Sequence, residues 1–188
     1  RILLSEKVGN ECDILLMTAT PIPRTLELAS YGDMDISRIH EKPKNRKDIT
    51  TKSVNIDKVE DLKKALIKKI QNDEKIYWVC PLVDESEKLA LQSVNNRLND
   101  LKKYFKAEQV DMVHGQMSQD QKNKIMLNFT KGDTKILIAT SVIEVGIDDP
   151  DATVMIIENA ERYGLSQLHQ LRGRVGRGKN QSTCILLF

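Results

Sequence analysis

Short apolar runs alternate with longer segments of helical periodicity along most of the chain. The apolar runs predict strands at residues 51–56, 75–83, 109–113, 135–139, 154–157 and 183–188. Helical segments of ten or more residues separate most of these runs, and connections of that length join parallel strands. Residues 76–79 are apolar without alternation, as expected of a strand covered on both faces. The sequence therefore predicts an α/β fold with a mostly parallel sheet between two layers of helices.

Such a sheet brings the carboxyl ends of its strands together at one edge. Because crossover connections share one hand, the loops at that edge lie side by side, and open α/β sheets bind their ligands there. Two tetrapeptides resemble capping boxes and predict helix starts, residues 57–60, with Asp57 in place of Ser or Thr, and residues 118–121. The second of these helices is expected to stop at Gly132.

Residues 42–52 are polar, rich in Lys and Arg, and without periodicity. A solvated linker is favoured there over a specific binding arm. We expect a C-terminal remnant of one domain in residues 1–38, a linker at 39–50 and a second domain in residues 51–188. The remnant is expected to hold a buried strand at residues 14–17. The chain begins at Arg1 and stops within an apolar run, so we expect it to be a piece of a longer polypeptide.

Charge and composition narrow the function classes. Lys and Arg number 29 and Asp and Glu 27. The net charge of +2 excludes a uniformly basic nucleic-acid coat protein and leaves room only for a local basic patch. The apolar runs are too short to span a bilayer, and we expect no signal peptide. Three scattered cysteines and three distant histidines predict a reduced, cytoplasmic protein without a metal site.

The segment 167–178 is the most informative part of the sequence. Arginines and glycines alternate in it, namely Arg172, Arg174 and Arg177 with Gly173, Gly176 and Gly178. Glycines allow tight bends and a close approach of the backbone to a ligand. Arginines carry permanent, planar charges that match phosphate oxygens. The segment predicts an anion site for a polyphosphate or a nucleic-acid backbone.

A phosphate-binding loop is an alternative interpretation of the same residues. Residues 173–179 match the GxxxxGK pattern, but Asn180 follows where a Ser or Thr is needed for Mg²⁺. A phosphate loop also follows a strand and opens a helix, whereas this segment follows a helical pattern. The alternative is therefore disfavoured.

Polar residues at three strand ends are further candidates for binding phosphate. Thr140 and Ser141 directly follow a buried strand, where hydroxyls and backbone N–H groups can hold a phosphate. Glu144 and Asp148 flank Gly146 and would orient the arginines or a ribose. The alternative is a polar turn capped by acids. The remaining candidates are His114 and Gly115, with a structural histidine as the alternative, and Thr18 and Thr20, which on their own indicate only a strand end.

Together these segments resemble the motifs of superfamily 2 helicases. Residues 18–20 resemble the motif that couples two motor domains, residues 139–148 the fifth motif, and residues 170–177 the QxxGRxGR arginine-finger motif. The match is closer to the RecG family, the ATP-dependent DNA helicases of bacterial recombination and repair. It runs over nearly the whole chain, including residues 17–26, 31–35, 78–87 and 157–165. The motor is shared with the transcription–repair coupling translocases.

The resemblance implies an ATP molecule held between two RecA-like domains, of which residues 51–188 would be the second and residues 1–38 the end of the first. The roles implied for single residues are arginine fingers for Arg174 and Arg177, organisation of the cleft for Gln170, nucleotide contacts for Glu144, Gly146, Asp148 and Gly173, DNA-backbone contacts for His114, Gly115, Thr140 and Ser141, and interdomain coupling for Thr18 and Thr20. ATP and Mg²⁺ would be held mainly by the first motor domain, whose phosphate loop and acidic box this sequence lacks.

The implied substrate is branched DNA, such as stalled replication forks and Holliday junctions, and the implied partners are the first motor domain and a wedge domain of the same polypeptide. The chain alone is predicted to be inactive as an ATPase. Two alternatives stay open. One is the motor of a transcription–repair coupling translocase, and the other is a non-catalytic module that binds nucleic acid through the arginine cluster.

Overall fold

The computed structural model describes Leu15, Met17, Ser37, Ile39 and residues 47–81, 87–140 and 149–188. The chain divides into two units, Arg1–Arg38 and Ile39–Phe188. The helices and strands below all belong to the second unit. Among the described residues, no helix has the length and hydrophobicity to span a membrane.

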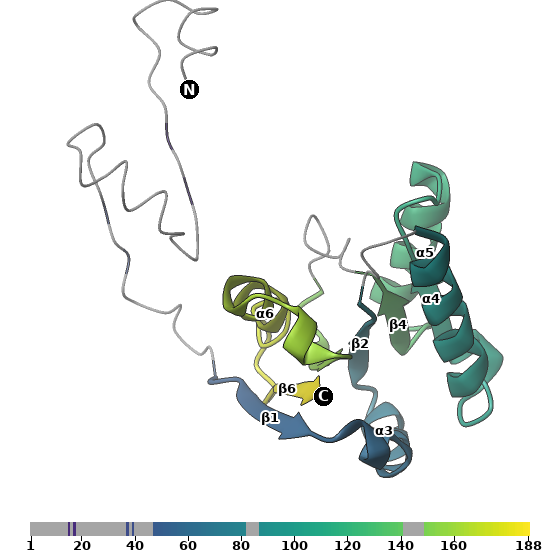
Figure 1. Ribbon diagram of the computed structural model, residues 1–188, viewed down its shortest axis with the longest axis horizontal. Helices are drawn as coiled ribbons and strands as arrows, with labels where there is room; N and C mark the ends of the chain where they lie inside the picture. Colours follow the sequence, from purple (N-terminus) through teal and green to yellow (C-terminus); the bar gives the residue numbers. More distant parts are fainter. Residues whose placement is uncertain are drawn as a thin grey trace, which may run out of the picture. The chain divides into compact units, whose positions relative to one another are not determined.

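The described part of the second unit contains six strands and four α-helices (Figure 1). The strands are β1 (Thr50–Val54), β2 (Lys75–Val79), β3 (Val110–Val113), β4 (Ile136–Ala139), β5 (Ala152–Ile157) and β6 (Thr183–Leu187). The α-helices are α3 (Val59–Gln71), α4 (Glu87–Leu101), α5 (Gln119–Lys131) and α6 (Leu165–Arg172). Three short 3₁₀ helices, η1 (Ile56–Lys58), η2 (Ala107–Gln109) and η4 (Ala160–Arg162), complete the described elements.

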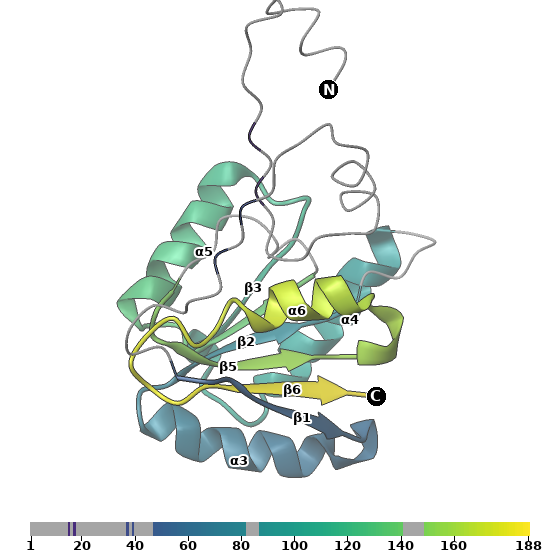
Figure 2. The ribbon, with the colours of Figure 1, turned by 90° about the vertical axis from the view of Figure 1, so that its left-hand side faces the viewer.

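The strands form one parallel sheet in the order β1-β6-β5-β2-β4-β3, which confirms the predicted fold class. The connections through α3 and α4 run along the sheet in one direction, and those through α5 and α6 run in the other. A single handedness of crossover then requires the two helix pairs to cover opposite faces. Figure 2 shows α6 on one side of the strands and α3 on the other.

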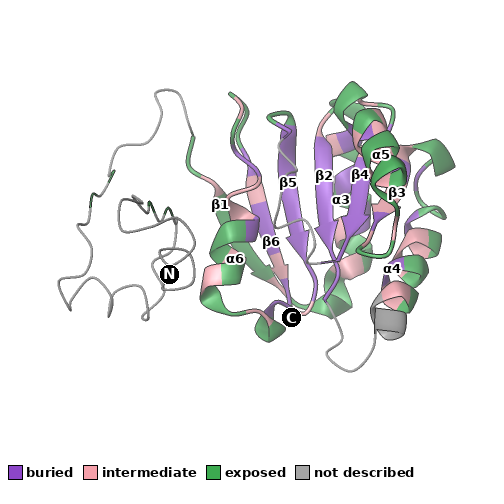
Figure 3. Ribbon diagram, turned by 90° about the horizontal axis from the view of Figure 1, so that it is seen from above, coloured by how far each residue is buried: buried purple, intermediate pink, exposed green. Residues whose placement is uncertain are grey.

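Successive residues of the central strands supply two cores. Ile76 and Trp78 of β2 join the core under α3 and α4, whereas Tyr77 and Val79 join the core under α5 and α6. All five residues of β2 are buried, and β1 at the sheet edge is mostly exposed (Figure 3). The period of two in a strand explains this division, and burial on both faces explains the unbroken apolar run.

The two predicted capping boxes have different outcomes. At α5 the box is present: the Ser118 Oγ accepts from the Gln121 N–H at 3.3 Å, and the Gln121 side chain accepts from the Ser118 N–H at 3.0 Å. The helix ends at Gly132, as predicted, in the left-handed conformation at φ 91°. At residues 57–60 the prediction is wrong. Asn55 caps η1 by accepting from the Asp57 N–H at 2.8 Å, and α3 starts after η1 without a side-chain cap.

Two strand predictions need correction. The strand predicted over residues 75–83 ends at Val79, before Pro81, which cannot donate to a neighbouring strand. Of the strand predicted to be buried at residues 14–17, only Leu15 and Met17 are described, and both are 81% exposed. An apolar segment becomes buried only when neighbouring strands or helices cover it, so hydrophobicity alone did not determine burial here.

Candidate nucleic-acid and nucleotide sites

A row of four residues crosses the carboxyl edge of the sheet. Glu158, Cys80, Thr140 and His114 directly follow β5, β2, β4 and β3, and the strand registers place them side by side in that order. The ladder continues into the row, since the Glu158 N–H donates to the Val79 carbonyl at 2.9 Å and the Cys80 N–H to the Ala139 carbonyl at 2.8 Å. The alternation of side chains assigns all four to the face of α3 and α4. We call these four residues the edge row.

Two neighbours in the edge row carry buried polar atoms that lack partners. Thr140 is 3% exposed, and neither its Oγ1 nor the Nδ1 of His114 makes a hydrogen bond to any described residue. An unsatisfied buried polar atom costs about 1–3 kcal/mol, so native proteins retain few of them and often use them. The arrangement suits a ligand that supplies hydrogen-bonding oxygens.

Lys122 of α5 adds positive charge beside His114. Its Nζ donates to the Gly115 carbonyl at 3.0 Å. Burial of the imidazole, together with the charge of Lys122, lowers the pKa of His114 below its usual value. A neutral imidazole and an ammonium group at the end of β3 favour an anion. Sequence reasoning missed Lys122, although its position one turn into the helix that follows His114 pointed to it.

The arginine-rich segment forms the loop after α6. Arg177 is exposed, and its Nε donates to the Gly173 carbonyl at 3.1 Å. Arg174 is half-buried, and Gln170 is exposed in the last turn of α6. Residues 174 and 177 thus lie outside the apolar core and present their charge at the surface of this unit.

Two glycines of this loop allow close packing within the chain. Gly176 has φ +73°, and a Cβ there would lie 2.8 Å from Cγ1 of Ile49. A Cβ on Gly178 would lie 2.3 Å from the Pro150 carbonyl oxygen. Ile49 precedes β1 and Pro150 precedes β5, so the loop lies at the amino edge of the sheet.

The candidate residues therefore lie at two opposite edges. Thr140, His114 and Gly115 are at the carboxyl edge, as expected. Arg174 and Arg177 are at the amino edge, away from the loops that follow the strands. The reason is the direction of α6, which starts at the carboxyl end of β5 and returns to the start of β6. The other candidates, Thr18, Thr20, Ser141, Glu144, Gly146 and Asp148, lie outside the described residues.

The amino edge also holds a buried ion pair. Lys75 Nζ lies 2.8 Å from Asp149 Oδ2, with the two side chains 5% and 1% exposed. The same ammonium donates to the Thr130 carbonyl at 2.8 Å, and the other carboxylate oxygen of Asp149 accepts from the Asp151 N–H at 2.9 Å. Nearby, the Thr153 hydroxyl donates to Glu74 at 2.5 Å. The buried polar groups named here are all paired.

A second polar cluster was not recognised from the sequence. The carboxylate of Glu158 accepts hydrogen bonds from the Trp78 indole N–H and from Nε of Arg97 in α4. The Arg97 guanidinium lies over the Trp78 ring, 5.2 Å from its centroid. Burial is the largest single influence on the pKa of Arg97 and acts to lower it, but the charge of Glu158, its hydrogen bond and the charge of Asp100 together raise that pKa. The signal that was missed is an acid placed directly after the fully buried run of β5.

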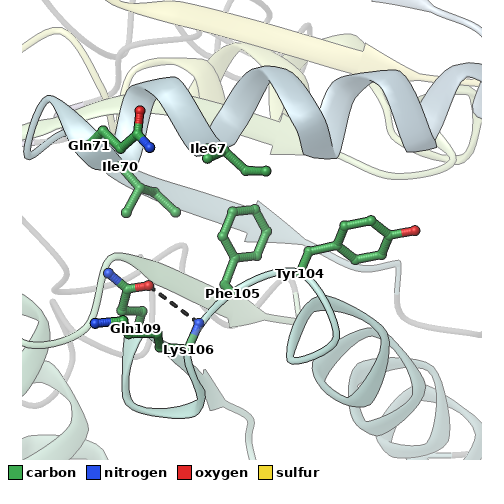
Figure 4. A pocket seen from close by; sticks show the side chains of 7 residues that line it. All are labelled: Ile67, Ile70, Gln71, Tyr104, Phe105, Lys106 and Gln109. Atoms are coloured by element: carbon green, nitrogen blue, oxygen red, sulfur yellow. Dashed lines mark hydrogen bonds between the residues drawn. The ribbon is translucent and has the colours of Figure 1, made fainter.

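A pocket lies between α3 and the segment that follows α4. In Figure 4, Ile67 and Ile70 of α3 face Phe105, and Tyr104 lies beside it. The pocket is lined by Ile67, Ile70, Gln71, Tyr104, Phe105, Lys106 and Gln109. None of the residues that the sequence singled out for function lines it.

Comparison with known families connects the two edges to a known kind of protein. Residues 57–179 match the family model of the helicase conserved C-terminal domain. The chain belongs to this helicase family. The match covers the helices and strands from α3 to α6 and both groups of candidate residues described above.

The chain is similar in sequence to ATP-dependent DNA helicases RecG, as predicted from its motifs. It is 50% identical to RecG of Borreliella burgdorferi over 184 residues, which are 96% of this chain and 26% of that protein. It is 47% identical to RecG of Streptococcus pneumoniae over 189 residues, 100% of this chain and 28% of that protein. The chain thus spans about a quarter of the length of these relatives.

A solved structure of RecG bound to a three-way DNA junction has the same fold. The TM-score is 0.72 at 42% sequence identity, over 90% of this chain and 22% of that one. The helicase C-terminal domain of this chain is accordingly RecA-like, with the parallel sheet and two helical layers predicted from the sequence.

Proposed function

We propose that the chain is the second motor domain of a RecG-type, ATP-dependent DNA helicase that acts on branched DNA in recombination and repair. Residues 1–38 would be the end of the first motor domain and residues 39–50 the link between the two. The similarity to RecG over nearly all of this chain supports the proposal. The activity belongs to the longer polypeptide, in the cytoplasm where its DNA substrate lies.

One observation carries the proposal: Thr140 and His114, neighbours in the edge row, have the buried atoms Oγ1 and Nδ1 unsatisfied among the described residues, and the charge of Lys122 acts on His114. With Ser141 and Gly115 they would contact phosphates of the DNA backbone. Such contacts do not read base sequence, which suits a translocase that must grip every stretch of DNA equally well. Branched substrates would be selected by the wedge domain of the same polypeptide.

The amino-edge loop would act on the nucleotide. Arg174 and Arg177 would reach the γ-phosphate of an ATP bound to the first motor domain, and Gln170 and Gly173 would shape that side of the cleft. The fit of the loop to this role rests on Gly176 and Gly178, whose close packing presents Arg177 at the surface. Arginine fingers of this kind contribute about 10³–10⁵ in rate, because they neutralise charge that develops during phosphoryl transfer.

The remaining candidates complete the cleft. Glu144, Gly146 and Asp148 would lie near the ribose and the arginines, and Thr18 and Thr20 would link the two motor domains. Mg²⁺ and the attacking water would be held by the first motor domain. Closure of the domains on ATP and their opening after hydrolysis would move the DNA.

The test measures ATP turnover of the full-length helicase that contains this chain, with branched, duplex and no DNA. Stimulation by branched DNA, reduced in Thr140→Val and in His114→Gln, is expected. Stimulation that instead depends on RNA polymerase would favour a transcription–repair coupling translocase. Strong salt-dependent DNA binding by the isolated chain, without ATP turnover in the full-length protein, would favour a binding module.

A further inference from the structure

The Arg97–Glu158 pair joins the helical layer of α4 to the carboxyl edge of the sheet. Arg97 Nε lies 2.5 Å from Glu158 Oε1, and its Nη1 lies 2.9 Å from Asp100 Oδ2. The side chains of Arg97 and Glu158 are 17% and 11% exposed. Trp78 contacts both members of the pair. Its indole N–H donates to the Glu158 carboxylate, and its ring lies against the Arg97 guanidinium.

The pair is anchored from α3 as well. Lys63, whose side chain is 1% exposed, places Nζ 2.5 Å from Asp100 Oδ2 and 2.6 Å from Glu60 Oε1. A continuous chain of charges therefore runs from the surface of α3, through α4, to the first residue after β5. Each member has an opposite charge beside it, so the chain of contacts holds Arg97 in one orientation.

Glu158 is in turn a member of the edge row. Extending the strand registers by one residue places Glu158 beside Cys80, Cys80 beside Thr140, and Thr140 beside His114. After Glu158 the backbone turns at Asn159, which has φ 47°, and continues through η4 into α6, the helix that leads to the arginine loop. Glu158 therefore lies between the edge row and the segment that leads to the arginine-rich loop.

We propose that Arg97 and Glu158 are a positioning pair that fixes the edge row, so that Thr140 and His114 meet the DNA backbone in a set geometry. The inference rests on the proposed function. Stability alone is a poor reason to keep such a pair, since apolar replacements of a buried ion pair are often neutral or stabilising. Geometry is a better reason, because a displacement of about 1 Å in a site can cost on the order of 10²-fold in activity.

The experiment compares Glu158→Gln, Arg97→Lys and Arg97→Gln in the full-length helicase. Gln at 158 can still accept from Trp78 but loses the charge that holds Arg97. The readouts are the concentration of branched DNA that gives half-maximal ATPase, the turnover at saturating DNA, and the thermal unfolding midpoint. Lys135→Met is the matched control, because the Lys135 side chain is 12% exposed and pairs with Asp73 at the opposite edge of the sheet.

We expect Glu158→Gln and Arg97→Gln each to raise the half-maximal DNA concentration about 10-fold, as a displaced contact would, with a much smaller change in turnover at saturating DNA. Arg97→Lys should restore part of the loss. The double variant should be no worse than either single variant, since both break one contact.

Two results overturn the inference: an unchanged DNA requirement in the folded Glu158→Gln and Arg97→Gln proteins, or an equal rise in Lys135→Met. The proposed function fails separately, and takes this inference with it, if wild-type turnover does not respond to DNA. If wild-type turnover responds to DNA and the variants have the same half-maximal DNA concentration, only the positioning role is removed.

Discussion

The two edges of the sheet differ in the pairing of their buried polar groups. At the amino edge, Lys75 and Asp149 neutralise each other at 2.8 Å and the Thr153 hydroxyl has Glu74 as its acceptor. At the carboxyl edge Glu158 is likewise paired with Arg97, but the Thr140 hydroxyl and Nδ1 of His114 are buried without a partner among the described residues. Both edges are formed by the same six strands, so this difference in pairing is due to the residues at the strand ends. Groups paired within the chain stabilise or position the structure around them, whereas groups without a partner are available to a ligand.

Replacing Arg177 should give the largest effect. Arg177→Ala is expected to lower ATP turnover of the full-length helicase by about 10³-fold or more, because the charge that develops on the γ-phosphate loses its counterpart. Steady-state ATPase measurements at saturating DNA would show this. The control is Lys179→Ala, an exposed cation in the same loop, which should leave turnover nearly unchanged. Equal losses in both variants would contradict a specific arginine finger.

Breaking the amino-edge ion pair should cost the most stability. Lys75→Met leaves Asp149 buried and uncompensated, so the free energy of unfolding should fall by about 3–5 kcal/mol. Urea unfolding followed by circular dichroism would measure it. Lys135→Met breaks a pair whose acid, Asp73, is 86% exposed, and it should cost about 1 kcal/mol or less. A small loss in Lys75→Met would mean that the amino edge does not depend on its buried pair.

Matched threonines at the two edges should respond with opposite signs. Thr140→Val removes an unpaired buried hydroxyl, so the free energy of unfolding should rise by about 1 kcal/mol while DNA-stimulated turnover falls. Thr153→Val removes a paired hydroxyl and should lower stability by about 1 kcal/mol without affecting the DNA response. Chemical denaturation and DNA titration of both variants test the comparison. A loss of stability in Thr140→Val would show that its hydroxyl is satisfied within the protein.

The sequence was most informative where periodicity determines structure. The apolar runs and the helical spacing between them predicted the strands and the parallel sheet, because burial on both faces leaves a distinct pattern. The Ser118 box was predictable since its partners are three residues apart. The cap at residues 57–60 was not, because Asn55, which precedes the pattern, accepts from the Asp57 N–H that Glu60 was expected to bind.

The sequence suggests which residue types form the candidate site but not how they are arranged. Motif resemblance singled out Thr140, His114 and the arginines, yet nothing local in the sequence shows that α6 carries the arginines to the opposite edge. The contact between Arg97 and Glu158 joins residues 61 positions apart, and only the sheet order brings them together. Long-range pairs of this kind follow from topology, which single-residue patterns do not encode.

The smallest effect should appear in the pH dependence of stability at the carboxyl edge. The pKa of His114 is lowered in the folded state by burial and by Lys122. The unfolded chain therefore binds the proton more readily than the folded chain. The contribution of His114 to stability is complete above the pKa of the unfolded state, about 6.5. It declines as the pH falls through that value toward the lower pKa of the folded state. Denaturation between pH 7.5 and about pH 5 should show this decline in wild type and less of it in His114→Gln. His169→Gln, at an exposed position of α6, should retain the wild-type slope.

Bound DNA should reduce the decline in stability at low pH, because a phosphate beside the His114 imidazole favours its protonated form. A pH profile that is the same for His114→Gln and wild type would place the imidazole in contact with solvent and would remove the contrast between the two edges at this residue.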